Sequence, residues 1–70
     1  MVANDFPFSV GDKVGVIRHE HGWHDGNLIA VITYRYKNAN GIWKYGAVCQ
    51  DEDYDGMEIE LNHTRDAIKF

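Results

Sequence analysis

The sequence predicts an all-β protein, a single small barrel of five short strands. Three features point to this class. Short runs rich in β-branched and aromatic residues recur along the chain, and Asn40-Gly41 is a dipeptide typical of a tight hairpin. No stretch has the apolar periodicity of a long helix. Five short strands without a long helix indicate a small barrel or sandwich, in which closure hides the edges of the strands.

The first three strands follow from local patterns. In "VGDKVGVI", residues 10–17, a Gly-Asp turn precedes an alternating segment that places Val14 and Val16 on one side. The segment "LIAVITYRYK", residues 28–37, is the second strand, and "IWKYGAVCQ", residues 42–50, repeats its style of composition after the Asn-Gly turn. These two segments are expected to pair as a hairpin.

Cross-strand pairing divides this hairpin into two faces. A connection of two or four residues gives the same division, and four residues are preferred because two would set Lys37 directly against Lys44. One face is then apolar along its whole length and carries Ala30, Ile32, Tyr34, Tyr36, Trp43, Tyr45, Ala47 and Cys49. The other face is basic near the tip and carries Thr33, Arg35, Lys37 and Lys44.

The last third of the chain predicts two more strands with a short turn between them. "MEIEL", residues 57–61, alternates strictly, so that Glu58 and Glu60 face outward. "NHTRD", residues 62–66, contains capping and turn residues suited to one helical turn, which we expect to be a 3-10 turn. "AIKF", residues 67–70, then supplies a short final strand.

This order of elements resembles the Src-homology-3-like barrels, in particular their Tudor and KOW-type relatives. The residues that carry the resemblance are "VGDKVGVI" at the first strand, "DGNLIAVI" at the entry to the second, and "MEIELNHTRDAIKF" at the close. The resemblance covers roughly residues 9–70. It implies that aromatic side chains from the loops form grooves or cages for peptides, with nearby acids favouring a cationic ligand.

Length and charge limit the possible functions. Seventy residues support one domain, with residues 1–8 as an N-terminal arm and residues 9–70 as the barrel. Pro7 excludes the arm from a central strand, and Phe6 and Phe8 are suited to anchor it. The net charge of -4 disfavours a general polyanion binder. No secretory or membrane-spanning stretch is visible, so a cytoplasmic protein with no membrane contact is expected.

The stretch "RHEHGWHDG" raises the question of a metal site. His19, His21 and His24 fall within six positions, and imidazoles of this kind bind zinc, copper or nickel. We interpret the stretch as a polar loop, because the sequence offers no second cluster of ligands and Asp25-Gly26 explains it as a turn.

A second cation motif lies in "DEDYDGMEIELN". Asp51, Asp53, Asp55 and Gly56 match the opening of a calcium loop, but Asn62 stands at the twelfth position, where a bidentate Glu is required. The flanking segments also look like strands rather than the helices of an EF-hand. We interpret this segment as a hairpin loop that at best binds a cation weakly, and no metal or cofactor is assigned.

The aromatic residues suggest a binding surface. They concentrate at loops and hairpin ends, where the polar atoms of Tyr and Trp suit a partly hydrated contact. The leading hypothesis is a non-enzymatic binding module or accessory subunit that contacts a basic or Pro-containing protein segment. The partner-binding residues are Trp23, Tyr34, Tyr36, Trp43, Tyr45, Asp53, Tyr54 and Asp55.

Two other functions stay open at this point, and an enzyme is not expected. A nucleic acid can contact the basic side of the hairpin, although the net charge disfavours it, through Arg18, Arg35, Lys37 and Lys44. A weak metal-binding protein would use the histidines or the acidic loop. Catalysis is not predicted because Cys49, the single cysteine, lies on the apolar face, where thiols are inert.

Overall fold

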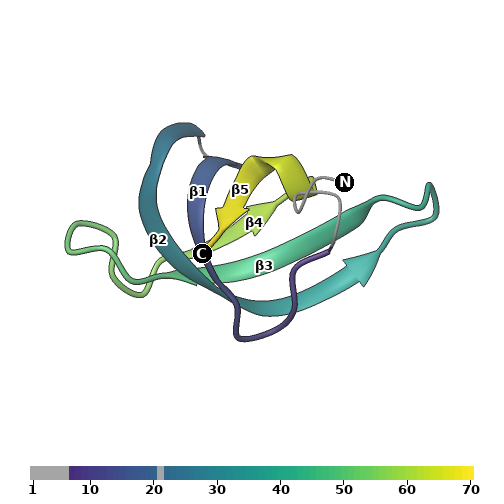
Figure 1. The fold of residues 1–70 in the computed structure, drawn as a ribbon, viewed down its shortest axis with the longest axis horizontal. Coiled ribbons are helices and arrows are strands. Elements are labelled where there is room, and N and C mark those ends of the chain that lie inside the picture. The colour runs from purple at the N-terminus through teal and green to yellow at the C-terminus, as the bar shows by residue number, and fades with distance from the viewer. Residues whose placement is uncertain (1–6, 21) are drawn as a thin grey trace.

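A computed structural model describes residues 7–20 and 22–70, and this part of the chain is all-β. It contains five strands and one 3-10 helix: β1 (Lys13–His19), β2 (Gly22–Lys37), β3 (Trp43–Cys49), β4 (Glu58–Leu61), η2 (Thr64–Asp66) and β5 (Ala67–Lys69). The strands form one antiparallel sheet in the order β4-β3-β2-β1-β5 (Figure 1). The predicted class, the five strands and the helical turn before the last strand are confirmed.

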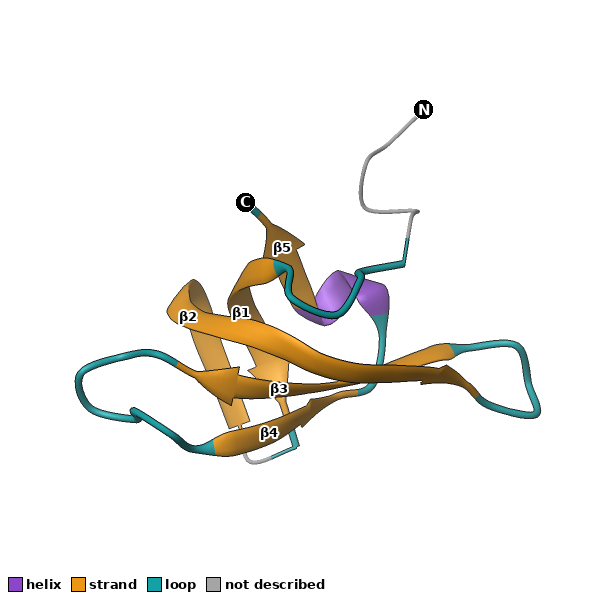
Figure 2. Ribbon diagram, turned by 90° about the horizontal axis from the view of Figure 1, so that it is seen from below, coloured by secondary structure: helices purple, strands orange, loops and turns teal. Residues whose placement is uncertain are grey.

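The sheet curls but does not close. β2 has 16 residues and is long enough to pair with β1 along its first part and with β3 along its second. Ala30 and Val31 pair with both neighbours, and Figure 2 shows β2 curving between them. The outer strands of the described sheet, β4 and β5, do not pair with each other. The closed barrel that the sequence predicts is therefore observed here as a curled sheet with two edges.

The prediction of a polar loop around the histidines is wrong. His19 and His24 lie in strands, and β2 begins at Gly22 and not at Leu28. The Asp-Gly signal belongs to an irregularity inside β2, where the pairing with β1 shifts register. Gly26 has a φ of 91°, and Asp25 Oδ1 accepts a hydrogen bond from the backbone N–H of Asn27 at 3.0 Å. Residues typical of a turn can thus form a bulge within a strand, and such a bulge bends the strand without ending it.

The core lies on the inner side of the curled sheet. Val14 and Val16 of β1 are fully buried, as their alternation predicts. Phe8 is also buried, and its ring lies 4.9 Å from that of Tyr45, so the core extends into the predicted arm. Residues 1–6, which include Phe6, lie outside the described residues. The core consists of Phe8, Val14, Val16, Leu28, Ala30, Ile32, Tyr45, Ala47, Cys49, Ile59, Leu61 and Ala67.

A bulge in the β2–β3 hairpin changes which side chains share a face. Ala30 pairs with Cys49 and Ile32 with Ala47, as predicted, but the register then shifts and Thr33 is skipped. Beyond this point Tyr34 pairs with Gly46, Arg35 with Tyr45, Tyr36 with Lys44 and Lys37 with Trp43. The connection is residues 38–42, which is one residue longer than the preferred four. The predicted faces are therefore correct at the base of the hairpin and wrong at its tip.

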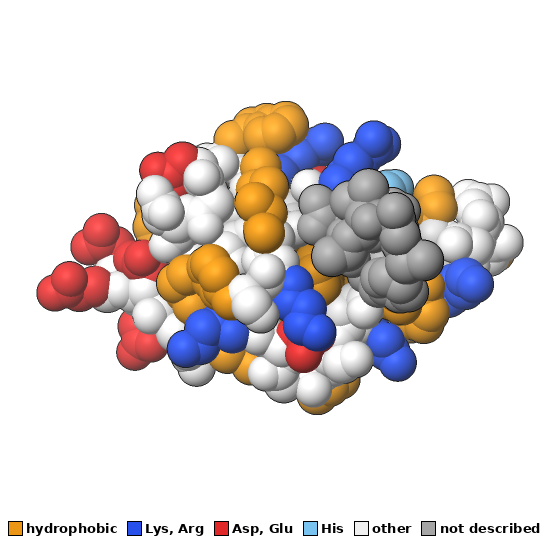
Figure 3. All heavy atoms as spheres, viewed as in Figure 1, with side chains coloured by type: hydrophobic (Ala, Val, Ile, Leu, Met, Phe, Trp, Pro, Cys, Tyr) orange, Lys and Arg blue, Asp and Glu red, His pale blue; other side chains and the backbone are white. Residues whose placement is uncertain are grey.

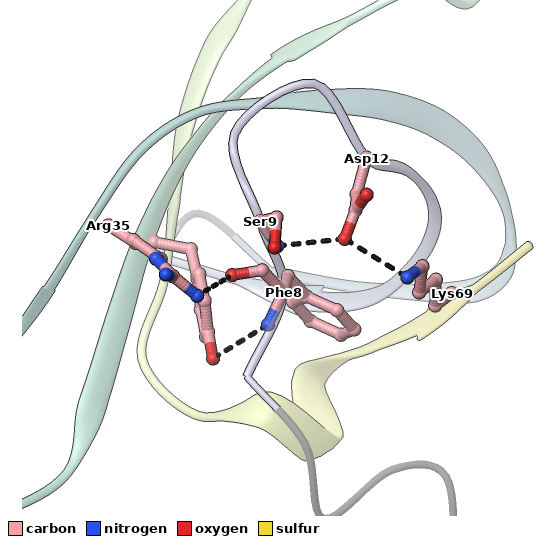
Figure 4. Close-up of polar contacts among 6 residues, drawn as sticks. Phe8, Ser9, Asp12, Arg35 and Lys69 are labelled. Atoms are coloured by element: carbon pink, nitrogen blue, oxygen red, sulfur yellow. Dashed lines mark hydrogen bonds and ion pairs between the residues drawn. The ribbon is translucent and has the colours of Figure 1, made fainter.

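Polar contacts attach the segment before β1 to the sheet (Figure 4). Arg35 donates from its guanidinium to the carbonyl of Phe8 at 2.8 Å. Asp12 accepts a hydrogen bond from the N–H of Ser9 at 2.7 Å and lies 3.4 Å from the ammonium of Lys69. The Ser9 hydrogen bond and the Lys69 charge lower the pKa of the Asp12 carboxyl. Within the described residues, no helix is long and apolar enough to cross a lipid bilayer.

Candidate functional site

A pocket of about 210 Å³ lies over β2, β3 and β4. We call it the Tyr34 pocket. Its lining combines an aromatic ring, two apolar residues and three carboxylates, and consists of Glu20, Thr33, Tyr34, Ala47, Glu58, Ile59 and Glu60. Glu58 and Glu60 come from β4, whose alternation directs them away from the core residues Ile59 and Leu61. Two segments far apart in sequence, Glu20 and β4, thus bring negative charge to one pocket.

The ring of Tyr34 is held in place by a glycine on the neighbouring strand. Tyr34 and Gly46 are cross-strand partners, and a Cβ added to Gly46 would overlap atoms of the Tyr34 ring. The ring therefore covers the backbone of β3 closely, which only a residue without a side chain permits. The Tyr34 hydroxyl donates to Glu60 Oε2 at 3.4 Å, and the Tyr36 ring stacks beside it at 6.4 Å. Tyr34 still exposes 47% of its surface.

The electrostatics of the Tyr34 pocket favour a cation. Partial burial and the charge of Glu60 raise the pKa of the Tyr34 phenol, so that this group is a neutral hydrogen-bond donor at pH 7. An aromatic ring beside carboxylates attracts a positive group that also carries apolar surface. Lys44 lies opposite Tyr36 and its ammonium contacts Asn62 at 3.5 Å, so one positive charge borders this side of the hairpin.

The opposite side of the hairpin tip carries a different combination. Trp43 has the guanidinium of Arg35 5.0 Å from its ring centroid and the ammonium of Lys37 5.7 Å from it. We call these three residues the Trp43 surface. Trp43 was predicted to bind a partner beside acidic residues, but the structure surrounds it with cations. The basic residues of the nucleic-acid alternative are also divided, since Lys44 lies on the Tyr34 side and Arg18 on β1.

Two other predicted partner-binding residues lie apart from both sides of the tip. Tyr45 is fully buried, and its hydroxyl accepts a hydrogen bond from the N–H of Phe8 at 3.2 Å, so its assignment to a binding surface is wrong. Its place opposite Arg35, on the inner side beyond the bulge, explains the difference. Trp23 is 71% exposed, but it lies near the β1–β2 turn with the guanidinium of Arg18 4.9 Å from its ring centroid.

The acidic loop between β3 and β4 forms the end of the molecule that lies to the left in Figure 1. Red side chains gather at that end in Figure 3, which has the same view. Asp51 Oδ1 accepts from the N–H of Asp53 at 3.0 Å, and Gly56 has a φ of 80°, as in a turn. The described residues contain no cluster of three or more histidine, cysteine or acidic side chains that could hold a metal. Tyr54, Asp53 and Asp55 are exposed in this loop and line no part of the Tyr34 pocket.

Two of the three candidate histidines lie together. His19 on β1 is 6% exposed, and its Nε2 lies 2.8 Å from Nε2 of His24 on β2. The ring of His24 also meets the ring of Tyr54 edge-on at 5.6 Å, so the acidic loop contacts this pair. The third candidate, His21, lies outside the described residues. The sequence pattern identified the pair, but its interpretation as a loop hid the approach of the two rings across strands.

The thiol of Cys49 lies in the core. Burial, and to a smaller extent the charge of Asp51, raises the pKa of this thiol. A raised pKa keeps the thiol protonated at neutral pH and lowers its nucleophilicity.

No protein-family model, curated protein or solved structure matches this chain. The functional conclusion therefore depends on the geometry of the chain itself. The three carboxylates of the Tyr34 pocket, those of Glu20, Glu58 and Glu60, were not among the predicted site residues. Outward alternation of Glu58 and Glu60 was visible in the sequence, but their position beside Tyr34 follows from the pairing of β4 with β3 and from the bulge at Thr33.

Proposed function

We propose that this protein is a non-enzymatic binding module, a Src-homology-3-like domain that holds a basic segment of a partner protein in the Tyr34 pocket. The observation that carries the proposal is the tyrosine ring seated on Gly46 beside Glu58 and Glu60. The order of strands, the helical turn before β5 and the curled sheet support the proposed fold.

The size of the Tyr34 pocket supports a single side chain as the bound group. At about 210 Å³ it is smaller than the roughly 300–1,000 Å³ typical of small-molecule sites. A lysine or arginine side chain combines an apolar stem, which can lie along the ring of Tyr34, with a charged end that the carboxylates attract. The rest of the partner segment then lies over the exposed outer side of the hairpin, where Tyr36 is 46% exposed.

The test compares peptides of opposite charge. The tag-free protein is titrated with a short Lys- and Arg-containing peptide and with an acidic peptide of equal length, and backbone amide shifts are recorded. We expect saturable shifts only with the basic peptide, centred on Thr33, Tyr34 and Glu60, and an affinity that falls with salt. Equal responses to both peptides, or shifts confined to the Trp43 surface, would contradict the proposal.

A matched pair of variants locates the charge that matters. Glu60→Gln removes a carboxylate of the pocket, and Glu52→Gln removes one from the exposed acidic loop. Because an exposed charge pair contributes about 0.2–1 kcal/mol, Glu60→Gln should lower the affinity for the basic peptide by up to about fivefold. The Glu58→Gln, Glu60→Gln double variant should lower this affinity further, and Glu52→Gln should change it little. A larger loss in Glu52→Gln would place the contact at the acidic loop.

The Trp43 surface supports nucleic-acid contact as a second candidate function. Two cations beside an indole ring are the groups that contact phosphates and stack on bases. A fluorescence titration with single-stranded oligonucleotides at increasing salt tests it. An affinity for the oligonucleotide that falls steeply with salt, with a smaller salt dependence in Lys37→Gln, would support this function. Titration curves that stay flat at all salt concentrations would exclude it.

A further inference from the structure

The imidazoles of His19 and His24 form a close contact that the binding function does not use. Their Nε2 atoms lie 2.8 Å apart, and the ring planes are inclined by 27°. At this distance one ring must carry a proton on Nε2 and the other must accept it, so the pair shares one proton between two nitrogens. Each ring comes from a different strand, His19 from β1 and His24 from β2.

We infer that His19 and His24 form a two-histidine chelating site for a divalent transition-metal ion, with Nε2 of each ring as a ligand and water completing the coordination. Imidazole is a preferred ligand of copper, nickel and zinc. The metal takes the place of the shared proton. The ring that donates in the metal-free pair changes tautomer, its proton moves from Nε2 to Nδ1, and both Nε2 lone pairs become available.

The separation of the two nitrogens suits square-planar metals best. With metal–nitrogen bonds of about 2.0–2.1 Å, two ligand nitrogens lie about 2.8–3.0 Å apart at a right angle and about 3.3–3.4 Å apart at a tetrahedral angle. The 2.8 Å of the hydrogen-bonded pair is close to the right-angled value, so the arrangement that Cu²⁺ and Ni²⁺ adopt with nitrogen ligands needs the smallest change in the distance between the two nitrogens. We therefore expect affinity in the order Cu²⁺, Ni²⁺, Zn²⁺.

The surroundings of the pair support a cation with access from solvent. His19 is 6% exposed and fixes one side of the site, whereas His24 is half-buried and gives the metal a route to water. Tyr54 packs edge-on against His24, which brings the acidic loop of residues 51–55 to this end of the molecule. Its carboxylates raise the local concentration of cations without acting as ligands in this site.

The experiment uses the tag-free full chain. Isothermal titration with CuCl₂ and NiCl₂ in a non-coordinating buffer should give one saturable site per chain. Because loss even of an outer partner of a metal ligand costs about 10–100-fold in affinity, His24→Ala should weaken binding at least about tenfold. The matched control is His63→Asn, which changes the histidine that caps η2 and keeps a side chain able to cap. It should bind as the unchanged protein does.

A second measurement needs no substitution. Substoichiometric Cu²⁺ should broaden the imidazole resonances of His19 and His24 before those of His63, and circular dichroism confirms that each variant folds. Three outcomes would overturn the inference: no saturable binding, binding that survives His24→Ala, or broadening that begins at Asp51, Asp53 and Asp55. None of these outcomes affects the peptide-binding proposal, which uses Thr33 and Tyr34 of β2 and does not involve His24.

Discussion

The two sides of the β2–β3 tip hold similar aromatic residues in opposite charge environments. On one side Tyr34 lies against Gly46 and beside Glu60, and on the other Trp43 lies between Arg35 and Lys37. The rings come from adjacent strands of one hairpin, so composition does not explain the difference.

The bulge at Thr33 explains it. An uninterrupted strand would place Tyr34 on the same side as Ile32, facing the core, with Arg35 directed outward. The extra residue turns Tyr34 toward the carboxylates of β4 and brings Arg35 to the side of Tyr45. One unpaired residue thus decides whether an aromatic ring meets acids or bases. The Tyr34 pocket is a consequence of an irregularity in the sheet.

The largest expected effect separates the buried aromatic residue from the exposed ones. Tyr45→Ala should lower the free energy of unfolding by about 3–5 kcal/mol, because it empties the centre of the core. Tyr36→Ala, at the exposed side, should change it by about 0.5 kcal/mol. Urea denaturation measures both. Tyr45→Phe keeps the ring and should cost about 1–3 kcal/mol, because the N–H of Phe8 loses its acceptor. Similar losses in Tyr45→Ala and Tyr36→Ala would contradict the assignment of the two sides.

The next effect concerns the contact between the Tyr34 ring and Gly46. Gly46→Ala should destabilise the protein by about 1–3 kcal/mol, because the new methyl group displaces the ring. Gly46→Ala should also lower the affinity for the basic peptide, because the ring of Tyr34 is displaced from the pocket. In a Tyr34→Ala background the same substitution should cost much less, so a double-mutant cycle measures the contact. Equal costs in the two backgrounds would show that the ring does not lie on Gly46.

A smaller effect is expected on the cationic side. Lys37→Gln removes one of the two cations beside Trp43 and should lower the free energy of unfolding by at most about 0.5–1 kcal/mol. It should leave the affinity for the basic peptide unchanged, because Lys37 lies on the side away from the Tyr34 pocket. Thermal unfolding and the peptide titration test the two parts. A fall in the affinity for the basic peptide would show that the peptide contacts both sides of the hairpin tip, contrary to this prediction.

The smallest effect depends on pH and concerns the segment that supports the cationic side. The folded-state pKa of Asp12 lies below its ordinary value of 3.8, so its ionised form favours folding at higher pH. This contribution is complete above the unfolded pKa and is lost as the pH falls through the folded pKa. Asp12→Asn should therefore be less stable than the unchanged protein at pH 6, and the difference should shrink below about pH 4. A difference that is constant between pH 6 and pH 2 would exclude this role for the carboxylate.

The parts of the fold that follow from local pattern were predictable. Alternation in residues 13–17 and 57–61 locates β1, β4 and the sides they bury, because the side-chain period of a strand is two. The turn residues of 62–66 locate η2 in the same way. In the site, Tyr34 and Tyr36 were predicted to bind a partner, and the structure leaves both exposed. That prediction remains to be tested by binding.

By itself, the sequence determined the class, the five strands, the single core and the concentration of acids in the β3–β4 loop, since each depends on residues close together in the chain. Tertiary structure decided which residues meet across strands. It turned Asp25-Gly26 into a bulge inside β2, skipped Thr33, buried Tyr45 and brought His24 to His19. Sequence patterns could not show these outcomes, because a bulge depends on how a strand pairs with a neighbour that is distant in sequence, and a shift of one residue exchanges the sides of everything beyond it.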